Sequence, residues 1–284
     1  MEECARVAGG TLPLRAVRKA VTGTGFTGAK EACIHRVLDP SKANQIAPRR
    51  CALAIMTKAP RAGAVKTRLQ PPLSSEEAAA LNVCFLRDTA SAICRAGEKA
   101  RGVAVYTPPE ARHEYDQILP GDFELLLQRG DGFGERLFLA TEDLLRVGFQ
   151  SCCLIDSDSP TVTAEAFCEA VDALQGEAER VVLGPTHDGG YYLIGMKRAF
   201  VQLFADIDWS TERVFDQTVA RAGEIGLEVH TLPSFFDVDD RFALRRLCDE
   251  LLGKGGESAP ATTNFLCQIV DREGRDRIWP HEQG

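Results

Sequence analysis

Short apolar runs alternate with longer amphipathic stretches along most of this 284-residue chain, from Cys51 to Leu252. The first run, CALAIMT, is continuously apolar, which is typical of a strand that is buried on both faces of a sheet. Strands and helices that alternate in this way predict an α/β fold, with a mostly parallel, Rossmann-like sheet and helices on both of its faces.

Local signals mark where the helices begin and end. Ser74 and Glu77 form a predicted capping box, Thr163 is a predicted N-cap, and Gly97 and Gly148 follow predicted helix ends. We expect strands at 51–57, 102–106, 123–128, 151–156, 180–186, 191–196 and 227–232, and helices at 74–97, 132–148, 163–176, 210–226 and 240–253.

We expect one α/β domain, residues 50–253, with two loose ends. Residues 1–49 lack a sustained apolar period and are locally basic, which favours a disordered leader over a start-site artefact or a weak targeting segment. Residues 254–284 are mostly polar, and their apolar pattern is interrupted, which favours a C-terminal tail that packs on the domain or trails from it.

The composition argues against two classes of binding partner. A net charge of −8 and a pI near 5.3 argue against a general binder of nucleic acid or of anionic membranes. No apolar stretch is long enough to span a bilayer, and the first residues lack the apolar segment of a secretory signal. The ten cysteines contain no C-x-x-C pair, which favours free thiols. We therefore expect a cytoplasmic protein that binds neither nucleic acid nor membrane.

The loop after the first predicted strand is rich in cations, and ligands of parallel sheets bind beyond the carboxyl ends of strands. This loop, TKAPRAGAVKTRL, carries Lys58, Arg61, Lys66 and Arg68 around Gly63. Glycine lets backbone amides approach an anion and the cations neutralise it, so we expect phosphate binding rather than a solvated loop. No G-K-[ST] opens the next helix, which argues against a P-loop.

Two short acidic segments each follow a predicted strand. Asp156 and Asp158 in DSDSPT share a face of an extended chain, as do Asp237 and Asp239 in FFDVDD. Mg²⁺ and Mn²⁺ prefer one or two carboxylates together with phosphate oxygens. Each segment alone fits a turn that starts a helix equally well. Taken together, they are candidates for opposite walls of one metal site.

Two further loops are candidates for contact with a ligand. GPTHDGGYYLIG contains an Asp-Gly-Gly turn, which fits both a hairpin and a close approach of the backbone to a ligand. In DIDWSTERV, either hydroxyl residue is a predicted helix N-cap whose helix has free amides for an anion. The candidate ligand-contacting residues of these two loops are Gly189, Gly190, Tyr191, Trp209, Ser210 and Thr211.

In their order along the chain, the motifs KAPRAGAVKTRL, DSDSPT, GPTHDGGYYLIG, IDWSTERV and FDVDDRFAL resemble a bacterial glycosyltransferase-A-like family. That family was long described as a domain of unknown function and has been associated with arsenosugar biosynthesis. It is part of the nucleotide-diphospho-sugar transferase superfamily, which also contains the molybdenum-cofactor and phospholactate nucleotidyltransferases. The resemblance runs from Cys51 to Leu252, and APATTNFL near Phe265 looks like the family's tail.

The resemblance implies roles for individual residues. Lys58, Lys66 and Arg68 would hold the nucleotide phosphates. Asp158 would be the metal aspartate of a D-x-D-like turn, and Asp239 the second ligand. Family members commonly have a small residue where this chain has Asp156, so Asp156 is either a third metal ligand or a neighbour of the site. Catalytic roles are assigned to Asp158 and to Asp188 of the Asp-Gly-Gly turn. The six candidate ligand-contacting residues of the two further loops are assigned to the acceptor or sugar side.

The resemblance also implies a Mg²⁺- or Mn²⁺-dependent transferase that acts on a nucleotide or nucleotide sugar and a small-molecule acceptor. We expect a glycosyltransferase-like enzyme with a nucleotide-diphospho-sugar donor. The first alternative is a nucleotidyltransferase that uses a nucleoside triphosphate and a small phosphorylated acceptor. The second is a nucleotide-binding protein without catalytic activity.

Overall fold

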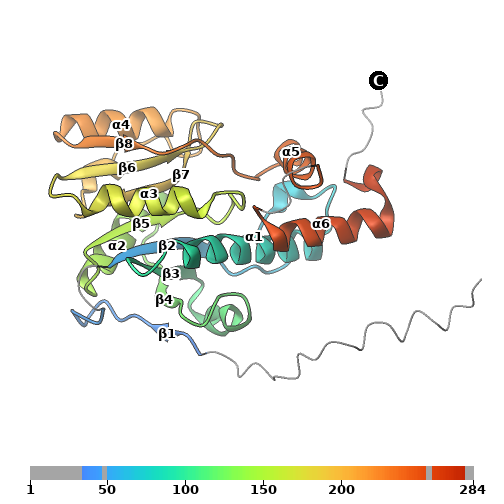
Figure 1. The fold of residues 1–284 in the computed structure, drawn as a ribbon, viewed down its shortest axis with the longest axis horizontal. Helices are drawn as coiled ribbons and strands as arrows, with labels where there is room; N and C mark the ends of the chain where they lie inside the picture. Colours follow the sequence, from blue (N-terminus) through green and yellow to red (C-terminus); the bar gives the residue numbers. More distant parts are fainter. Residues whose placement is uncertain (1–33, 47–49, 254–257, 279–284) are drawn as a thin grey trace, which may run out of the picture. The chain divides into compact units, whose positions relative to one another are not determined.

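A computed structural model describes residues 34–46, 50–253 and 258–278. In these residues eight strands form one sheet in the order β1-β4-β3-β2-β5-β7-β6-β8 (Figure 1). Neighbouring strands are parallel except at β7, which is antiparallel to both β5 and β6. The α/β class with a mostly parallel sheet is thus confirmed. The strands are β1 (Arg36–Val37), β2 (Cys51–Lys58), β3 (Ala100–Thr107), β4 (Glu124–Leu127), β5 (Ser151–Ile155), β6 (Arg180–Pro185), β7 (Tyr191–Met196) and β8 (Glu228–Thr231).

Helices cover both faces of the sheet. They are α1 (Ser75–Arg95), α2 (Phe133–Arg146), α3 (Ala164–Gln175), α4 (Val214–Glu224), α5 (Arg241–Leu251) and α6 (Pro260–Glu273). Apolar residues of α1 and α3 pack on one face with Leu53, and those of α2 and α4 pack on the other with Ala54. Successive residues of a strand point to opposite faces, so the continuous apolar run of β2 contributes to both cores.

The described part of the expected leader belongs to the sheet. β1 pairs in parallel with β4, so residues 34–46 differ from the disordered segment expected for 1–49. His35 Nδ1 lies 3.0 Å from the carbonyl oxygen of Phe123, and Leu38, 2% exposed, packs in the core under α2. A two-residue strand is too short to produce a periodic apolar pattern. The rest of the expected leader, 1–33 and 47–49, lies outside the described residues.

The expected C-terminal tail contains α6, which packs with α1 and α5 in a third apolar cluster. Asp88 of α1 is 2% exposed and accepts hydrogen bonds from the backbone N–H groups of Ala261 and Thr262, at 2.9 and 2.8 Å. These are orphan donors in the first turn of α6, so the Asp88 carboxylate caps that helix across the domain.

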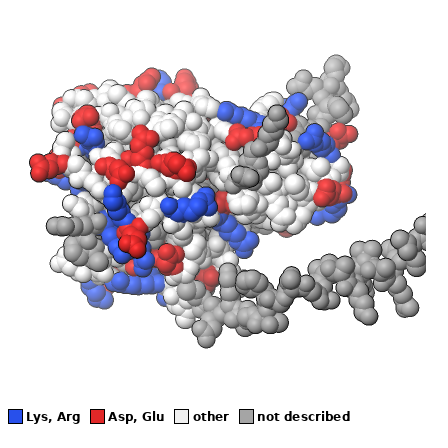
Figure 2. Space-filling model, in the orientation of Figure 1, with Lys and Arg blue, Asp and Glu red and all other residues white. Residues whose placement is uncertain are grey.

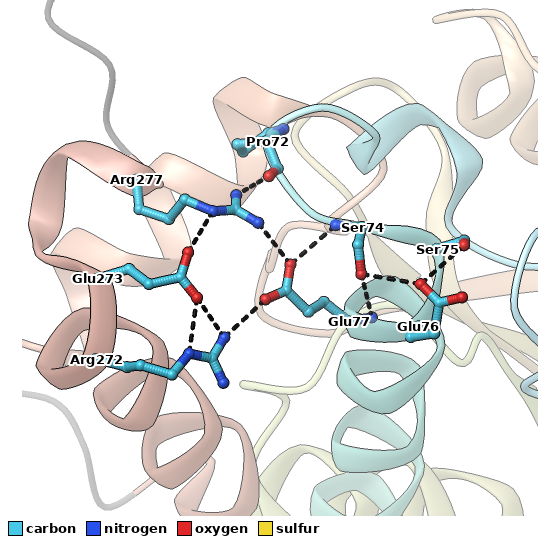
Figure 3. Close-up of polar contacts among 8 residues, drawn as sticks. All are labelled: Pro72, Ser74, Ser75, Glu76, Glu77, Arg272, Glu273 and Arg277. Atoms are coloured by element: carbon cyan, nitrogen blue, oxygen red, sulfur yellow. Dashed lines mark hydrogen bonds and ion pairs between the residues drawn. The ribbon is translucent and has the colours of Figure 1, made fainter.

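A network of ion pairs joins the end of α6 to the start of α1 (Figure 3). Arg272 and Arg277 each donate to the Glu77 carboxylate, at 3.0 and 2.7 Å, and both also contact Glu273. Arg277 donates in addition to the carbonyl oxygen of Pro72. Glu77 is also the second member of the predicted capping box, which is confirmed.

No helix among the described residues is long and apolar enough to cross a bilayer. On the face drawn in Figure 2, acidic and basic side chains are interspersed.

Candidate active site

Three loops that follow strands meet at one edge of the sheet. The acidic turn at Asp156 follows β5, the Asp-Gly-Gly turn joins β6 to β7, and the segment 235–239 follows β8. Because β7 is antiparallel to its neighbours, its first residue lies at the edge where β5 and β6 end. Backbone bonds hold the loops together: His187 N–H donates to Phe235 O at 3.1 Å, and Val238 N–H to Asp158 O at 2.9 Å.

Asp158 and Asp239 converge on the side-chain ammonium of Lys66. Its Nζ lies 2.8 Å from Asp158 Oδ1 and 3.0 Å from Asp239 Oδ1, and it donates to the carbonyl oxygen of Val238 at 2.8 Å. Burial opposes the charge of Lys66, but the two aspartates outweigh it and raise the pKa of this lysine. The structure therefore brings the two expected metal ligands together. It places Lys66 between them, whereas the sequence assigns Lys66 to phosphate.

The carboxylate of Asp156 accepts hydrogen bonds within its own turn. Its Oδ1 accepts from the N–H groups of Asp158 and Ser159 at 3.2 Å each, and its Oδ2 accepts from the Ser159 hydroxyl at 2.7 Å. Burial, and then the charge of Asp158, raise its pKa to about 8. These bonds shape the loop that presents Asp158, so the geometry differs from the metal-ligand role considered for Asp156.

Asp188 is held in the Asp-Gly-Gly turn with its carboxylate on the cleft. Its Oδ1 accepts from the Thr186 hydroxyl at 2.5 Å and from Gly190 N–H at 3.1 Å. Gly189 has φ +89, and a Cβ there would lie 2.1 Å from the carbonyl oxygen of Glu212. The turn is therefore a hairpin turn that also needs glycine for close packing against the segment before α4.

A cleft of about 550 Å³ opens above these loops. In the part of the chain that the structure describes, six carboxylates line it, and Arg68 contributes its only cationic side chain. Burial and the charges of Asp188 and Asp239 raise the pKa of Asp237 to about 6, which reflects this crowding of acids. The six acids are Asp156, Asp158, Asp188, Glu212, Asp237 and Asp239.

The apolar wall of the cleft includes a residue that the sequence analysis missed. Phe133, at the start of α2, is 54% exposed and meets Trp209 edge-on, with ring centroids 4.9 Å apart. The motif GFGERL indicated only a helix start, because nothing local links it to Trp209. Tyr191 also lines the cleft, but its hydroxyl is buried.

Ser210 and Thr211 line the cleft without capping a helix. The helix α4 begins later than expected, at Val214, and its N-cap residue Arg213 makes no side-chain capping bond. Thr211 instead donates to Asp208 O at 2.7 Å and accepts from Arg213 N–H at 3.3 Å. The expected cap at Ser210 or Thr211 is therefore wrong, because this segment forms a turn that packs against Gly189.

A second, smaller pocket of about 380 Å³ adjoins the cleft on the side of the basic loop. Lys58 and Arg68 line it with Asn82, a buried residue of α1 that the sequence analysis did not single out. Gly63 has φ +72, as a tight loop requires, and Arg61 is turned away to bind Glu114 at 2.6 Å. Asp158, Asp239, Arg68 and Ser210 line both spaces, so the expected metal ligands stand at the wall that they share.

The donor set fits a divalent ion that keeps part of its coordination for a substrate. Among residues 34–46, 50–253 and 258–278, no group of three or more His, Cys, Asp or Glu is placed to hold a metal. Two carboxylates that already converge on one cation do match the needs of Mg²⁺ or Mn²⁺, which take their other ligands from water and phosphate. The residues present therefore fit such an ion only together with a phosphate ligand.

Comparisons with known proteins agree with the expected resemblance. The family model described as "Uncharacterized protein conserved in bacteria (DUF2064)" matches residues 90–211. A crystal structure from Desulfovibrio desulfuricans G20, described as a "putative nucleotide-diphospho-sugar transferase", is 27% identical, with a TM-score of 0.73 over 83% of this chain and 99% of that one. The fold and the family resemblance are confirmed.

More distant structures are also similar. A nucleotidyl transferase from Methanothermobacter is 14% identical over 72% of this chain and 98% of that one, with a TM-score of 0.47. Rv0371C of Mycobacterium tuberculosis H37Rv, in complex with manganese, is 17% identical over 71% and 98%, with a TM-score of 0.43. No curated protein sequence matches the chain.

Proposed function

We propose that this protein is a divalent-metal-dependent glycosyltransferase that uses a nucleotide-diphospho-sugar donor. The observation that carries the proposal is the convergence of Asp158 and Asp239 on one cation, at the wall between a basic pocket and an acidic cleft. The similarity to the Desulfovibrio protein, whose description names nucleotide-diphospho-sugar transfer, supports it.

The charges on the two sides of this wall suggest where each substrate binds. Lys58 and Arg68 in the smaller pocket have no ion-pair partner in the part of the chain that the structure describes, so they are available for a diphosphate. A bound Mg²⁺ or Mn²⁺ would supply positive charge to the leaving diphosphate. The acidic cleft disfavours a phosphorylated acceptor and favours a neutral, hydroxyl-rich or cationic one. This favours glycosyl transfer over nucleotidyl transfer to a phosphorylated acceptor.

In the proposed reaction, an acceptor hydroxyl oxygen bonds to the anomeric carbon of the donor sugar. The bond from that carbon to the diphosphate oxygen breaks, and the nucleoside diphosphate leaves with the electron pair. We assign Asp188 as the base that takes the hydroxyl proton, because one of its oxygens is fixed by Thr186 and Gly190 while the carboxylate lines the cleft. Phe133 and Trp209 offer an apolar surface for the sugar or acceptor ring.

The test is to incubate the protein and Mn²⁺ with a panel of nucleotide sugars and nucleoside triphosphates and to identify the leaving group. Release of nucleoside diphosphate from a nucleotide sugar, lost in Asp158→Asn, is the expected result. Release of pyrophosphate from a triphosphate would replace the proposal by nucleotidyl transfer. Nucleotide binding that is unchanged when metal is removed, with no product from any donor, would indicate a protein without catalytic activity.

A further inference from the structure

Lys66 occupies the position that the proposed metal ion needs. Its side chain is 4% exposed, and its ammonium has three acceptors, one each from Asp158, Asp239 and the backbone of Val238. A lysine ammonium has three N–H groups, so its hydrogen-bonding capacity is filled. The two aspartate side chains are 31% and 49% exposed, so a cation that arrives from the cleft reaches them from the solvent side.

The backbone of Lys66 is unusual for a residue with a side chain. Its φ of 50 and ψ of 36 lie in the left-handed region, which lysine seldom adopts. Its Nζ also lies 5.6 Å from the centroid of the Phe85 ring of α1. The loop therefore holds Lys66 in a rare conformation, and the buried end of the side chain makes specific contacts.

The smaller pocket gives the Lys66 side chain a second place to bind. This pocket is lined by Lys66 itself and by Lys58 and Arg68, the two cations that we assign to the diphosphate. An ammonium and a divalent ion repel each other and compete for the same two carboxylates. A diphosphate in the pocket would offer the ammonium new anionic partners a short side-chain movement away.

We propose that Lys66 is a built-in cation that occupies the metal position when no substrate is bound and moves onto the diphosphate when the metal–nucleotide complex enters. This inference rests on the proposed function. It adds that metal and nucleotide each bind weakly alone and strengthen each other. The metal alone must displace Lys66 without giving it a new partner, whereas the complex supplies one. Coupling of this kind is reciprocal between the two ligands.

The experiment measures Mn²⁺ binding directly, by titration followed through the electron paramagnetic resonance signal of free Mn²⁺. In the absence of nucleotide, Lys66→Met should bind Mn²⁺ at least about tenfold more tightly than the parent, a difference of about 1.4 kcal/mol. The matched control is Arg68→Met, which removes a cation from the same loop that does not contact the two aspartates. Its Mn²⁺ affinity should change much less than that of Lys66→Met.

A second titration, with ADP, GDP, UDP or CDP present, measures the coupling. The nucleoside diphosphate should raise the Mn²⁺ affinity of the parent by a larger factor than that of Lys66→Met. Lys66→Gln keeps a donor for the carbonyl oxygen of Val238 and should show the same changes in Mn²⁺ binding as Lys66→Met. It therefore replaces Lys66→Met in the titrations if Lys66→Met does not fold. Circular dichroism and thermal unfolding check the fold of each variant.

The outcomes separate this inference from the proposed function. Mn²⁺ binding by Lys66→Met and Lys66→Gln that is equal to or weaker than that of the parent would overturn the displacement of Lys66 but leave the metal site standing. No Mn²⁺ binding by any variant, with or without a nucleoside diphosphate, would overturn the metal site and the proposed function with it. Tighter Mn²⁺ binding by the Lys66 variants that is lost when Asp158→Asn is added would support both the displacement of Lys66 and the proposed metal site.

Discussion

The backbone N–H of Val238 donates a hydrogen bond to the carbonyl oxygen of Asp158, 2.9 Å away. This bond fixes two acidic segments side by side, although they are about eighty residues apart in the chain. Asp239, the next residue, then shares a cation with the side chain of Asp158. The site therefore depends on backbone pairing between loops, so some of its residues bind ligands while others hold the loops in place.

The first prediction concerns the cation that is available for phosphate. Arg68→Ala should weaken the binding of a nucleoside diphosphate by about 1.5–3 kcal/mol, because a charge-assisted bond is lost. Its thermal unfolding should hardly change, since the side chain is exposed. Arg61→Ala is the matched control: it is in the same loop but its guanidinium binds Glu114, so nucleotide affinity should be kept. Isothermal titration calorimetry measures both, and equal losses would contradict the assignment.

Replacing each of the two aspartates of the acidic turn should have a different effect. Asp158→Ala should abolish metal-dependent turnover and the rise in melting temperature that Mn²⁺ causes with a nucleoside diphosphate. Asp156→Ala should lower the melting temperature of the metal-free protein, because three hydrogen bonds that shape the turn are lost. Thermal unfolding with and without Mn²⁺ compares them. If Asp158→Ala kept the full Mn²⁺ effect, the metal would lie elsewhere.

The strand that precedes the expected domain boundary should stabilise the fold. Leu38→Ala should lower the free energy of unfolding by about 2–3 kcal/mol, since it leaves a cavity under α2. Ile34→Ala, at a side chain that is 72% exposed, should change it by less than about 0.5 kcal/mol. Urea denaturation distinguishes the two. Equal stability of both variants would show that residues 34–46 add nothing to the domain.

A buried carboxylate at the start of β4 should make stability depend on pH. Glu124 is 5% exposed, its nearest cations, Arg36 and Arg101, are 3.7 and 4.0 Å away, and burial raises its pKa above the usual 4.5. The folded state thus binds the proton more tightly than the unfolded state does. The contribution of Glu124 to the free energy of unfolding is therefore largest below pH 4.5 and is lost as the pH rises through the raised pKa.

Glu124→Gln keeps the shape without the charge, so its stability should fall less as the pH rises over that window. Glu98→Gln, at an exposed position, should follow the parent. Urea midpoints measured at several pH values test this. A parent and a Glu124→Gln variant with parallel curves would mean that the Glu124 carboxylate has its ordinary pKa in the fold.

The cap across the domain should matter more than the exposed ion pairs of the same helix. Asp88→Ala should destabilise the protein by about 1–2 kcal/mol, because two N–H groups of α6 lose their buried acceptor. Arg272→Ala, whose side chain is 61% exposed, should cost about 0–1 kcal/mol. Chemical denaturation ranks the two, and the reverse order would place the main anchor of α6 in the ion-pair network of Figure 3.

The sequence alone determined the class of fold and selected the loops of the candidate site. The periodic spacing of apolar residues, the Ser74–Glu77 capping box and the Asp-Gly-Gly turn are local signals. Local hydrogen bonds and side-chain spacing determine the structure that each of them forms. The rule that ligands bind beyond strand ends then selected the basic loop and both acidic segments in advance. Each of these features can be read within a few neighbouring residues.

Only the tertiary structure decided which of those charges meet. Lys66 reaches Asp158 and Asp239 across the sheet edge. Phe133 of α2 meets Trp209 of the turn before α4, and Asp156 turns inward to hold its own loop. Contacts between distant segments depend on strand order and register, for which one sequence carries no local signal. The position of a lysine between two expected metal ligands therefore became visible only once the chain was folded.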